Sequence, residues 1–142
     1  DELGLARDQY SVSLLACDDA RIAALNGEFR GKAQATNVLS WPSEDRAAAA
    51  PGEMPHLPPP QPTGPPAELG DIAIAWETCM AEAADLSRPF DHHVTHLLVH
   101  GLMHLLGFDH ETDADAALME GVETRVLARL GVPDPYWTER DV

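Results

Sequence analysis

Residues 97–110 read LLVHGLMHLLGFDH, and this stretch contains both a helix and the signal that ends it. Apolar side chains occupy every turn up to Leu106, which indicates a helix that is buried over most of its surface. Gly107 is typical of the residue that follows a helix, because glycine adopts the left-handed backbone conformation found there. We therefore predict a helix over about residues 91–106, followed by a tight turn.

Three histidines lie in this stretch. Because His100 and His104 are four residues apart, a helix places both imidazoles on one face. The turn at Gly107 lets the chain double back, so that His110 can reach the same ion. Three histidine nitrogens with one open position are typical of a catalytic zinc site, and we predict one Zn²⁺ per chain. The alternative is three hydrogen-bonded histidines in a buried helix, although polar rings there need partners.

Four further polar residues of this region have predicted roles. His96 lies one turn before His100 and is expected either to orient a ligand or to contact substrate; a partly exposed histidine is the alternative. Asp109 precedes the third ligand and is expected to accept an imidazole N–H, as metal-binding histidines commonly require, or else to act in catalysis. His92 and His93 are expected at the surface, because they open the helix.

The spacing of the three histidines equals that of the metzincin proteases, H-E-x-x-H-x-x-G-x-x-H. One position differs, because Gly101 stands where those enzymes have the glutamate that serves as general base. The pattern therefore favours a zinc hydrolase but disfavours peptide hydrolysis by the usual route.

The rest of the chain predicts an α+β fold in one domain covering residues 1–142. Alternating or apolar runs predict three strands, and 3.6-residue periodicity predicts three more helices. The expected strands are 11–17, 36–41 and 70–76, and the further helices are 19–30, 77–86 and 114–130. The last helix carries an apolar stripe at Leu118, Val122, Val126 and Leu130. Residues 43–68 hold eight of the 12 prolines, which predicts a long flexible loop.

Composition limits the functional classes. The net charge of −15 repels nucleic acid on average, so RNA binding would need a local positive patch. No run approaches the roughly 20 apolar residues of a membrane span, and we expect a cytoplasmic protein. Cys17 and Cys79 are far apart and outside any CxxC motif, which predicts two reduced thiols rather than zinc ligands.

Residues 100–110 resemble the signature of the YbeY family of bacterial rRNA maturation factors, which are metal-dependent endoribonucleases. Further blocks agree in order and approximate spacing, and the resemblance covers about residues 11–135. These blocks are LN at 25–26, FRGK at 29–32, TNVLSWP at 36–42 and LGDIAI at 69–74.

The resemblance implies a small mixed sheet of about four strands covered by helices, with the metal site on a helix–turn segment. It implies a zinc-dependent endoribonuclease that acts on single-stranded RNA, namely the 3′ end of 16S rRNA, and takes part in ribosome quality control. The small ribosomal subunit and its proteins would be its partners. Arg30 matches an arginine implicated in the family's activity and is expected to bind phosphate, with Lys32 beside it. The alternative for these two is a solvated helix end.

Three features depart from the family pattern. The family pattern has a further strand and helix before the point at which this chain begins, and part of that segment is expected to be absent here. Ala33 stands where an aspartate is common, and the proline-rich loop is longer than usual. None of these departures falls on the three histidines.

Two other functions stay open, a zinc hydrolase of peptides or small molecules and a non-enzymatic ribosome-assembly factor with structural zinc. Also open is whether water or the RNA 2′-hydroxyl attacks.

Overall fold

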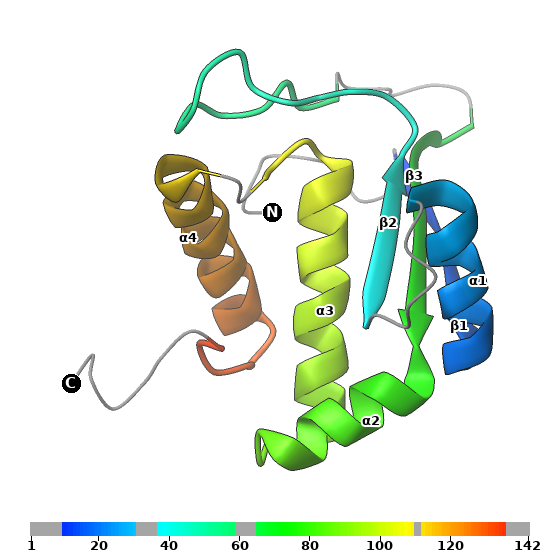
Figure 1. Cartoon of the computed structure of the whole chain (residues 1–142). Helices are drawn as coiled ribbons and strands as arrows, with labels where there is room; N and C mark the ends of the chain where they lie inside the picture. The colour runs from blue at the N-terminus through cyan, green and yellow to red at the C-terminus, as the bar shows by residue number, and fades with distance from the viewer. Residues whose placement is uncertain (1–9, 31–36, 59–64, 110–111, 136–142) are drawn as a thin grey trace.

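The structure is a computed structural model that describes residues 10–30, 37–58, 65–109 and 112–135, with only the backbone described at 27–30. It has the α+β architecture that the sequence predicts (Figure 1). In chain order its elements are β1 (Tyr10–Cys17), α1 (Asp19–Arg30), β2 (Val38–Pro42), β3 (Ala67–Ala75), α2 (Trp76–Asp85), α3 (Phe90–Leu105) and α4 (Asp113–Arg129).

The three strands form one mixed sheet in the order β1-β3-β2. β3 is central, parallel to β1 and antiparallel to β2, with Leu14 opposite Ile72 and Ser40 opposite Ile72 on the other side. The described part of the chain thus has three strands rather than about four. Each segment with a strand pattern in the sequence forms a strand, whereas the fourth strand was implied by the family resemblance alone.

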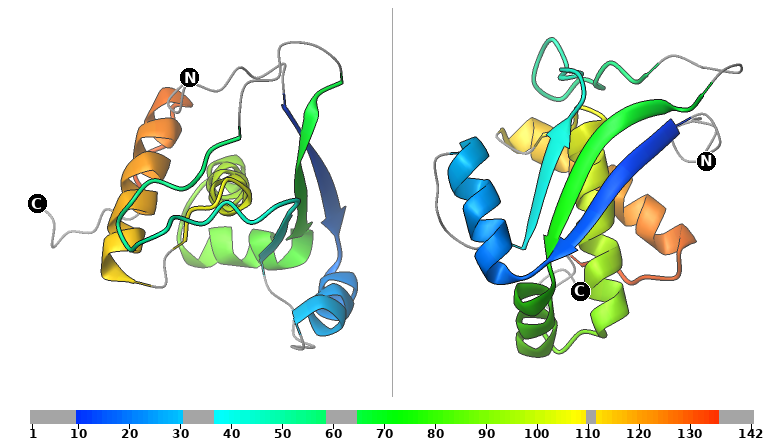
Figure 2. Two further views of the ribbon diagram at one scale, coloured as in Figure 1. Left: turned by 90° about the horizontal axis from the view of Figure 1, so that it is seen from above. Right: turned by 90° about the vertical axis from the view of Figure 1, so that its right-hand side faces the viewer.

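Alternation along β3 gives the sheet two different faces. Ile72 packs in the larger core with Val99 and Met103 of α3. Ala73 points the other way, into a smaller cluster with Ile22 of α1. Seen from above, α3 lies between the sheet and α4, and α1 lies by the opposite face of the sheet (Figure 2). The helix that carries the histidines is therefore the middle layer of the molecule.

The segment after β2 packs across the C-terminal end of α3. Arg46 is buried, and its guanidinium donates to the carbonyl oxygens of Leu105 at 2.9 Å and Leu69 at 3.4 Å. The Gly52 N–H donates to Asp115 Oδ1 of α4 at 2.8 Å. These bonds join the first half of the proline-rich segment to both helices. The flexibility expected of residues 43–68 stays a prediction.

Replacing Arg46 with methionine is expected to lower the free energy of unfolding by about 1–3 kcal/mol. Methionine fills much of the volume but leaves the Leu105 carbonyl without this donor, and an unsatisfied buried group costs about 1–3 kcal/mol. The Leu69 carbonyl still accepts from the Ser43 N–H at 3.0 Å. Urea unfolding measures the difference. Arg21→Met, at an exposed position of α1, is the matched control and should change stability by less than about 0.5 kcal/mol. Equal losses in the two variants would contradict this role for Arg46.

Candidate metal centre

The centre of α3 carries a row of imidazoles, one per turn, at His96, His100 and His104. The Nε2 atoms of His100 and His104 lie 3.1 Å apart, and their ring planes are inclined by 82°. This is the arrangement that the four-residue spacing predicts, because residues i and i+4 lie above one another on a helix. Both side chains are half-buried, so the pair is reached from outside and is still flanked by the apolar core.

The geometry of this pair fits a zinc ion. With zinc–nitrogen bonds of about 2.0–2.1 Å and a tetrahedral angle, two ligand nitrogens lie about 3.3–3.4 Å apart. The observed 3.1 Å between the two Nε2 atoms is close to that separation. Neutral imidazole is also a donor that suits zinc and related transition metals.

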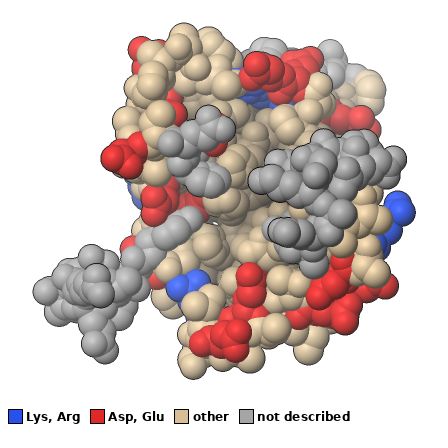
Figure 3. Space-filling view, viewed as in Figure 1, with Lys and Arg blue, Asp and Glu red and all other residues tan. Residues whose placement is uncertain are grey.

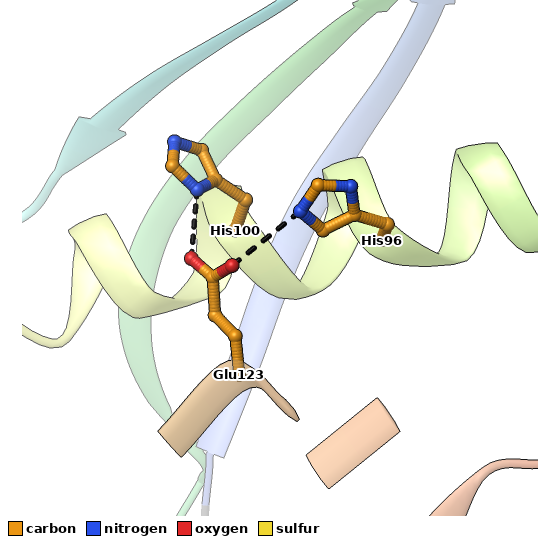
Figure 4. Close-up of side chains that lie close together, drawn as sticks. All are labelled: His96, His100 and Glu123. Atoms are coloured by element: carbon orange, nitrogen blue, oxygen red, sulfur yellow. Dashed lines mark hydrogen bonds and ion pairs between the residues drawn. The ribbon is translucent and has the colours of Figure 1, made fainter. Parts of the chain in front are cut away.

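Glu123 of α4 completes a group on the other side of His100. Its carboxylate has Oε1 2.7 Å from His100 Nδ1 and Oε2 3.4 Å from His96 Nε2 (Figure 4). Ligand atoms of His96, His100 and Glu123 all lie within 4.8 Å of one another, so the group could hold a metal ion. His96 is thus placed beside the predicted ligands, through the carboxylate of α4.

Glu123 was not among the predicted site residues, because the buried side of α4 extends one residue beyond the predicted apolar stripe. The stripe expected through Leu118, Val122, Val126 and Leu130 is only partly correct. Leu130 is 59% exposed, whereas Met119, Val122, Glu123 and Leu127 are buried. Met119, Glu123 and Leu127 follow one another at four-residue spacing. A glutamate at the centre of such an apolar row was the signal that could have identified it.

The other predicted site residues are described in part. His110 and Lys32 lie outside the described residues, and Arg30 ends α1 with its side chain outside them. Asp109 is half-buried just after the turn, where it lines a pocket together with residues 47–51 of the loop. The roles predicted for these four residues stay predictions.

Gly101 faces the sheet rather than the imidazole row. A Cβ atom built there would lie 3.3 Å from Ile72 Cδ1 and 3.5 Å from Val38 Cγ2. A longer side chain at this position would therefore force Ile72 and Val38 to shift. The position that carries the general base in metzincins is therefore filled by close packing of α3 on the sheet.

His93 is buried, so the prediction that it lies at the surface is wrong. It is 4% exposed, and its Nε2 lies 3.0 Å from Glu82 Oε1 on α2. Glu82 also accepts from Asn37 Nδ2 at 3.2 Å. The first turn of α3 packs against α2, a tertiary contact that the position of His93 at a helix start did not reveal. His92 beside it is half-buried.

Both cysteines are free thiols with raised pKa values. Burial, followed by the nearby charges of Glu82 and Asp19, raises the pKa of Cys79 to about 11. Burial and the charge of Asp18 raise the pKa of Cys17. Both groups therefore stay protonated near neutral pH, while zinc binds the thiolate. That neither cysteine is a metal ligand stays a prediction.

Known proteins resemble this chain over nearly its whole length. The family model described as endoribonuclease YbeY matches residues 2–131. A relative from Jannaschia sp. (strain CCS1) is 64% identical over 135 residues, which cover 95% of this chain and 81% of the relative. A relative from Dinoroseobacter shibae is 62% identical over 138 residues, covering 96% and 75%. Both are named endoribonuclease YbeY. This chain is therefore a member of the YbeY family.

Proposed function

We propose that this protein is a zinc-dependent endoribonuclease that cuts single-stranded RNA during rRNA maturation. The observation that carries the proposal is the pair of half-buried imidazoles on α3, whose Nε2 atoms lie 3.1 Å apart in a chain of the YbeY family. His100 and His104 would hold one zinc ion per chain, with His110 as third ligand. The 3′ end of 16S rRNA is the proposed target, and ribosome quality control is the proposed wider role.

The predicted site residues would have separate roles in metal binding and in RNA binding. When bound, zinc would supply Lewis acidity toward a phosphoryl oxygen and toward water. His100 and His104 would bind it as neutral imidazoles. Arg30 and Lys32 would bind the phosphates that flank the scissile bond, because a guanidinium pairs with phosphate through two parallel hydrogen bonds. Asp109 would hold an imidazole N–H.

The surface charge bears on how RNA would bind. On the face shown in Figure 3, Asp and Glu side chains gather in several places and Lys and Arg in few. With a net charge of −15, the protein would bind free RNA weakly and with strong salt dependence. Proteins of the small ribosomal subunit would supply the remaining affinity. No helix in the described part of the chain is long and apolar enough to cross a membrane; the cytoplasm is the proposed location.

Two alternatives are less well supported. Peptide hydrolysis lacks its usual base, because Gly101 stands at that position and packs closely on Ile72 of the sheet. A purely structural zinc would call for a fourth protein ligand, whereas His96 Nε2 points to the Glu123 carboxylate (Figure 4). An open coordination position is what distinguishes catalytic from structural sites.

The test of the proposal is cleavage of a single-stranded RNA by the purified protein. We expect cleavage that stops with a chelator and returns with added Zn²⁺. A duplex of the same sequence should be cut much more slowly. Cleavage that continues in chelator would contradict metal dependence. Absence of cleavage both on free RNA and on immature ribosomal particles would favour the assembly-factor alternative.

Arg30→Glu is expected to keep the metal and the fold and to lower RNA cleavage by about 100-fold or more, the cost typical of removing one donor that stabilises transition-state charge. Zinc content and circular dichroism report the first two, and turnover reports the third. Arg21→Glu changes the net charge equally at an exposed position of the same helix and should stay within about twofold of the parent, as expected for a surface site. Unchanged turnover in Arg30→Glu would remove Arg30 from the site.

A further inference from the structure

Glu123 is a carboxylate in a place where carboxylates are rarely found. Its exposure is 0%, and its neighbours along the buried side of α4 are Met119, Val122 and Leu127. Moving a carboxylate out of water costs several kcal/mol unless hydrogen bonds or opposite charges replace the lost hydration. Its position therefore depends on its partners.

Those partners are two imidazoles of the neighbouring helix. Each carboxylate oxygen faces one ring, Oε1 with His100 Nδ1 at 2.7 Å and Oε2 with His96 Nε2 at 3.4 Å (Figure 4). His96 and His100 are four residues apart, so α3 presents both rings to the same carboxylate. The shorter contact has the length of a charge-assisted hydrogen bond.

This hydrogen bond decides which nitrogen of His100 is available to a metal. An ionised carboxylate only accepts, so the bonded Nδ1 must carry a proton. In the neutral ring the lone pair is then on Nε2, the atom that lies 3.1 Å from His104 Nε2. A carboxylate bonded to the far nitrogen also fixes the ring's orientation and makes the ligating nitrogen more basic.

The distances argue against Glu123 as a ligand in its own right. Two ligand atoms on one zinc lie about 3.3–3.4 Å apart, given bonds of about 2.0–2.1 Å and tetrahedral angles. The 2.7 Å between Glu123 Oε1 and His100 Nδ1 is well below that separation. A metal bound through Nδ1 would also turn the same ring's Nε2 away from the ion shared with His104.

We propose that Glu123 is a positioning residue, which holds His100 through its Nδ1–H so that Nε2 faces the metal shared with His104. The proposal rests on the zinc site of the proposed function. It requires neither RNA cleavage nor a direct Glu123–metal bond.

The first test uses the unaltered protein. Nitrogen-15 NMR of the histidine side chains should show His100 with its proton on Nδ1, both in metal-free protein and after one equivalent of Zn²⁺. A His100 protonated on Nε2, or metallated through Nδ1, would overturn the proposal. This measurement does not depend on whether any variant folds.

The second test compares two glutamate-to-glutamine variants by zinc competition with a chromophoric chelator. Glu123→Gln should bind one zinc about 10–100-fold more weakly than the parent, the range expected for partners of ligating histidines. Glu82→Gln is the matched control, because Glu82 also bonds a histidine of α3, namely His93 at 3.0 Å on the side facing α2. It should bind zinc within about twofold of the parent, since it lies outside the site.

Cobalt substitution separates positioning from ligation. The visible absorption bands of the Co²⁺ protein report the ligand set, so Glu123→Gln should keep the band positions of the parent. Shifted bands would make Glu123 a ligand, and unchanged zinc affinity would remove it from the site. A parent protein that binds no zinc would overturn this proposal together with the zinc dependence of the proposed function. Zinc binding with the expected tautomer but no RNA cleavage would leave this proposal standing and contradict the proposed function alone.

Discussion

Replacing His104 with alanine is expected to remove the metal and to lower cleavage of single-stranded RNA by more than about 100-fold, because loss of even an outer partner of a ligand costs about 10–100-fold. His104 supplies one of the two Nε2 atoms that lie 3.1 Å apart on α3. Without it, the other imidazole one turn from His100 is His96, whose Nε2 lies against the Glu123 carboxylate at 3.4 Å. Metal analysis of the purified variant and the RNA cleavage assay measure the two effects.

His92→Ala is the matched control for this variant. It removes another half-buried histidine of α3, but from the first turn, two helical turns before His100. We expect parental zinc content and turnover from it. Full zinc occupancy in His104→Ala would contradict the ligand assignment. Equal losses in both variants would indicate damage to α3 as a whole.

Gly107→Ala is expected to destabilise the fold by about 3 kcal/mol or more, from a left-handed backbone that costs about 1–2 kcal/mol and overpacking that costs about 1–3 kcal/mol. Gly107 has a φ of +101°, and a Cβ there would lie 2.3 Å from the carbonyl oxygen of Arg46. The obstacle is backbone, which cannot rotate away as a side chain can. Urea unfolding measures the loss, and zinc affinity should fall too, because this turn leads into His110.

Gly131→Ala separates the two causes. Gly131 also has a positive φ, +77°, but nothing lies within 4 Å of a Cβ built there. This variant should lose only the backbone contribution, about 1–2 kcal/mol. If the two variants lose equal stability, the contact between Gly107 and Arg46 contributes nothing, and the turn is held by backbone conformation alone.

The helices and strands were predictable because their signals are local. The helix predicted over 19–30 matches α1 at both ends, and those predicted over 91–106 and 114–130 each begin and end one residue later than α3 and α4. Glycine after the last turn and apolar periodicity depend only on neighbouring residues. The juxtaposition of His100 and His104 is equally local, because helix geometry fixes residues four apart.

The predictions were wrong where the burial of a side chain depended on a neighbouring helix. Glu123 was missed because it lies one residue away from the predicted apolar stripe of α4. An amphipathic pattern defines the buried face of a helix only to within about one position. His93 was predicted at the surface, but α2 packs on that turn of α3 and buries it. The local sequence does not show this contact. In both cases the missing information was which face of a helix its neighbour covers.

The sequence by itself determined the type of each element, the α+β class and the imidazole pair of α3, because all three follow from spacing along the chain. Only the tertiary structure decided that β1 and β2 flank β3 in opposite directions, that Arg46 binds the end of α3, and that Glu123 faces His100. Glu123 and His100 are 23 residues apart, and Arg46 and Leu105 are 59 apart. Such pairs form when layers pack and side chains fill the space between them, which no local pattern records.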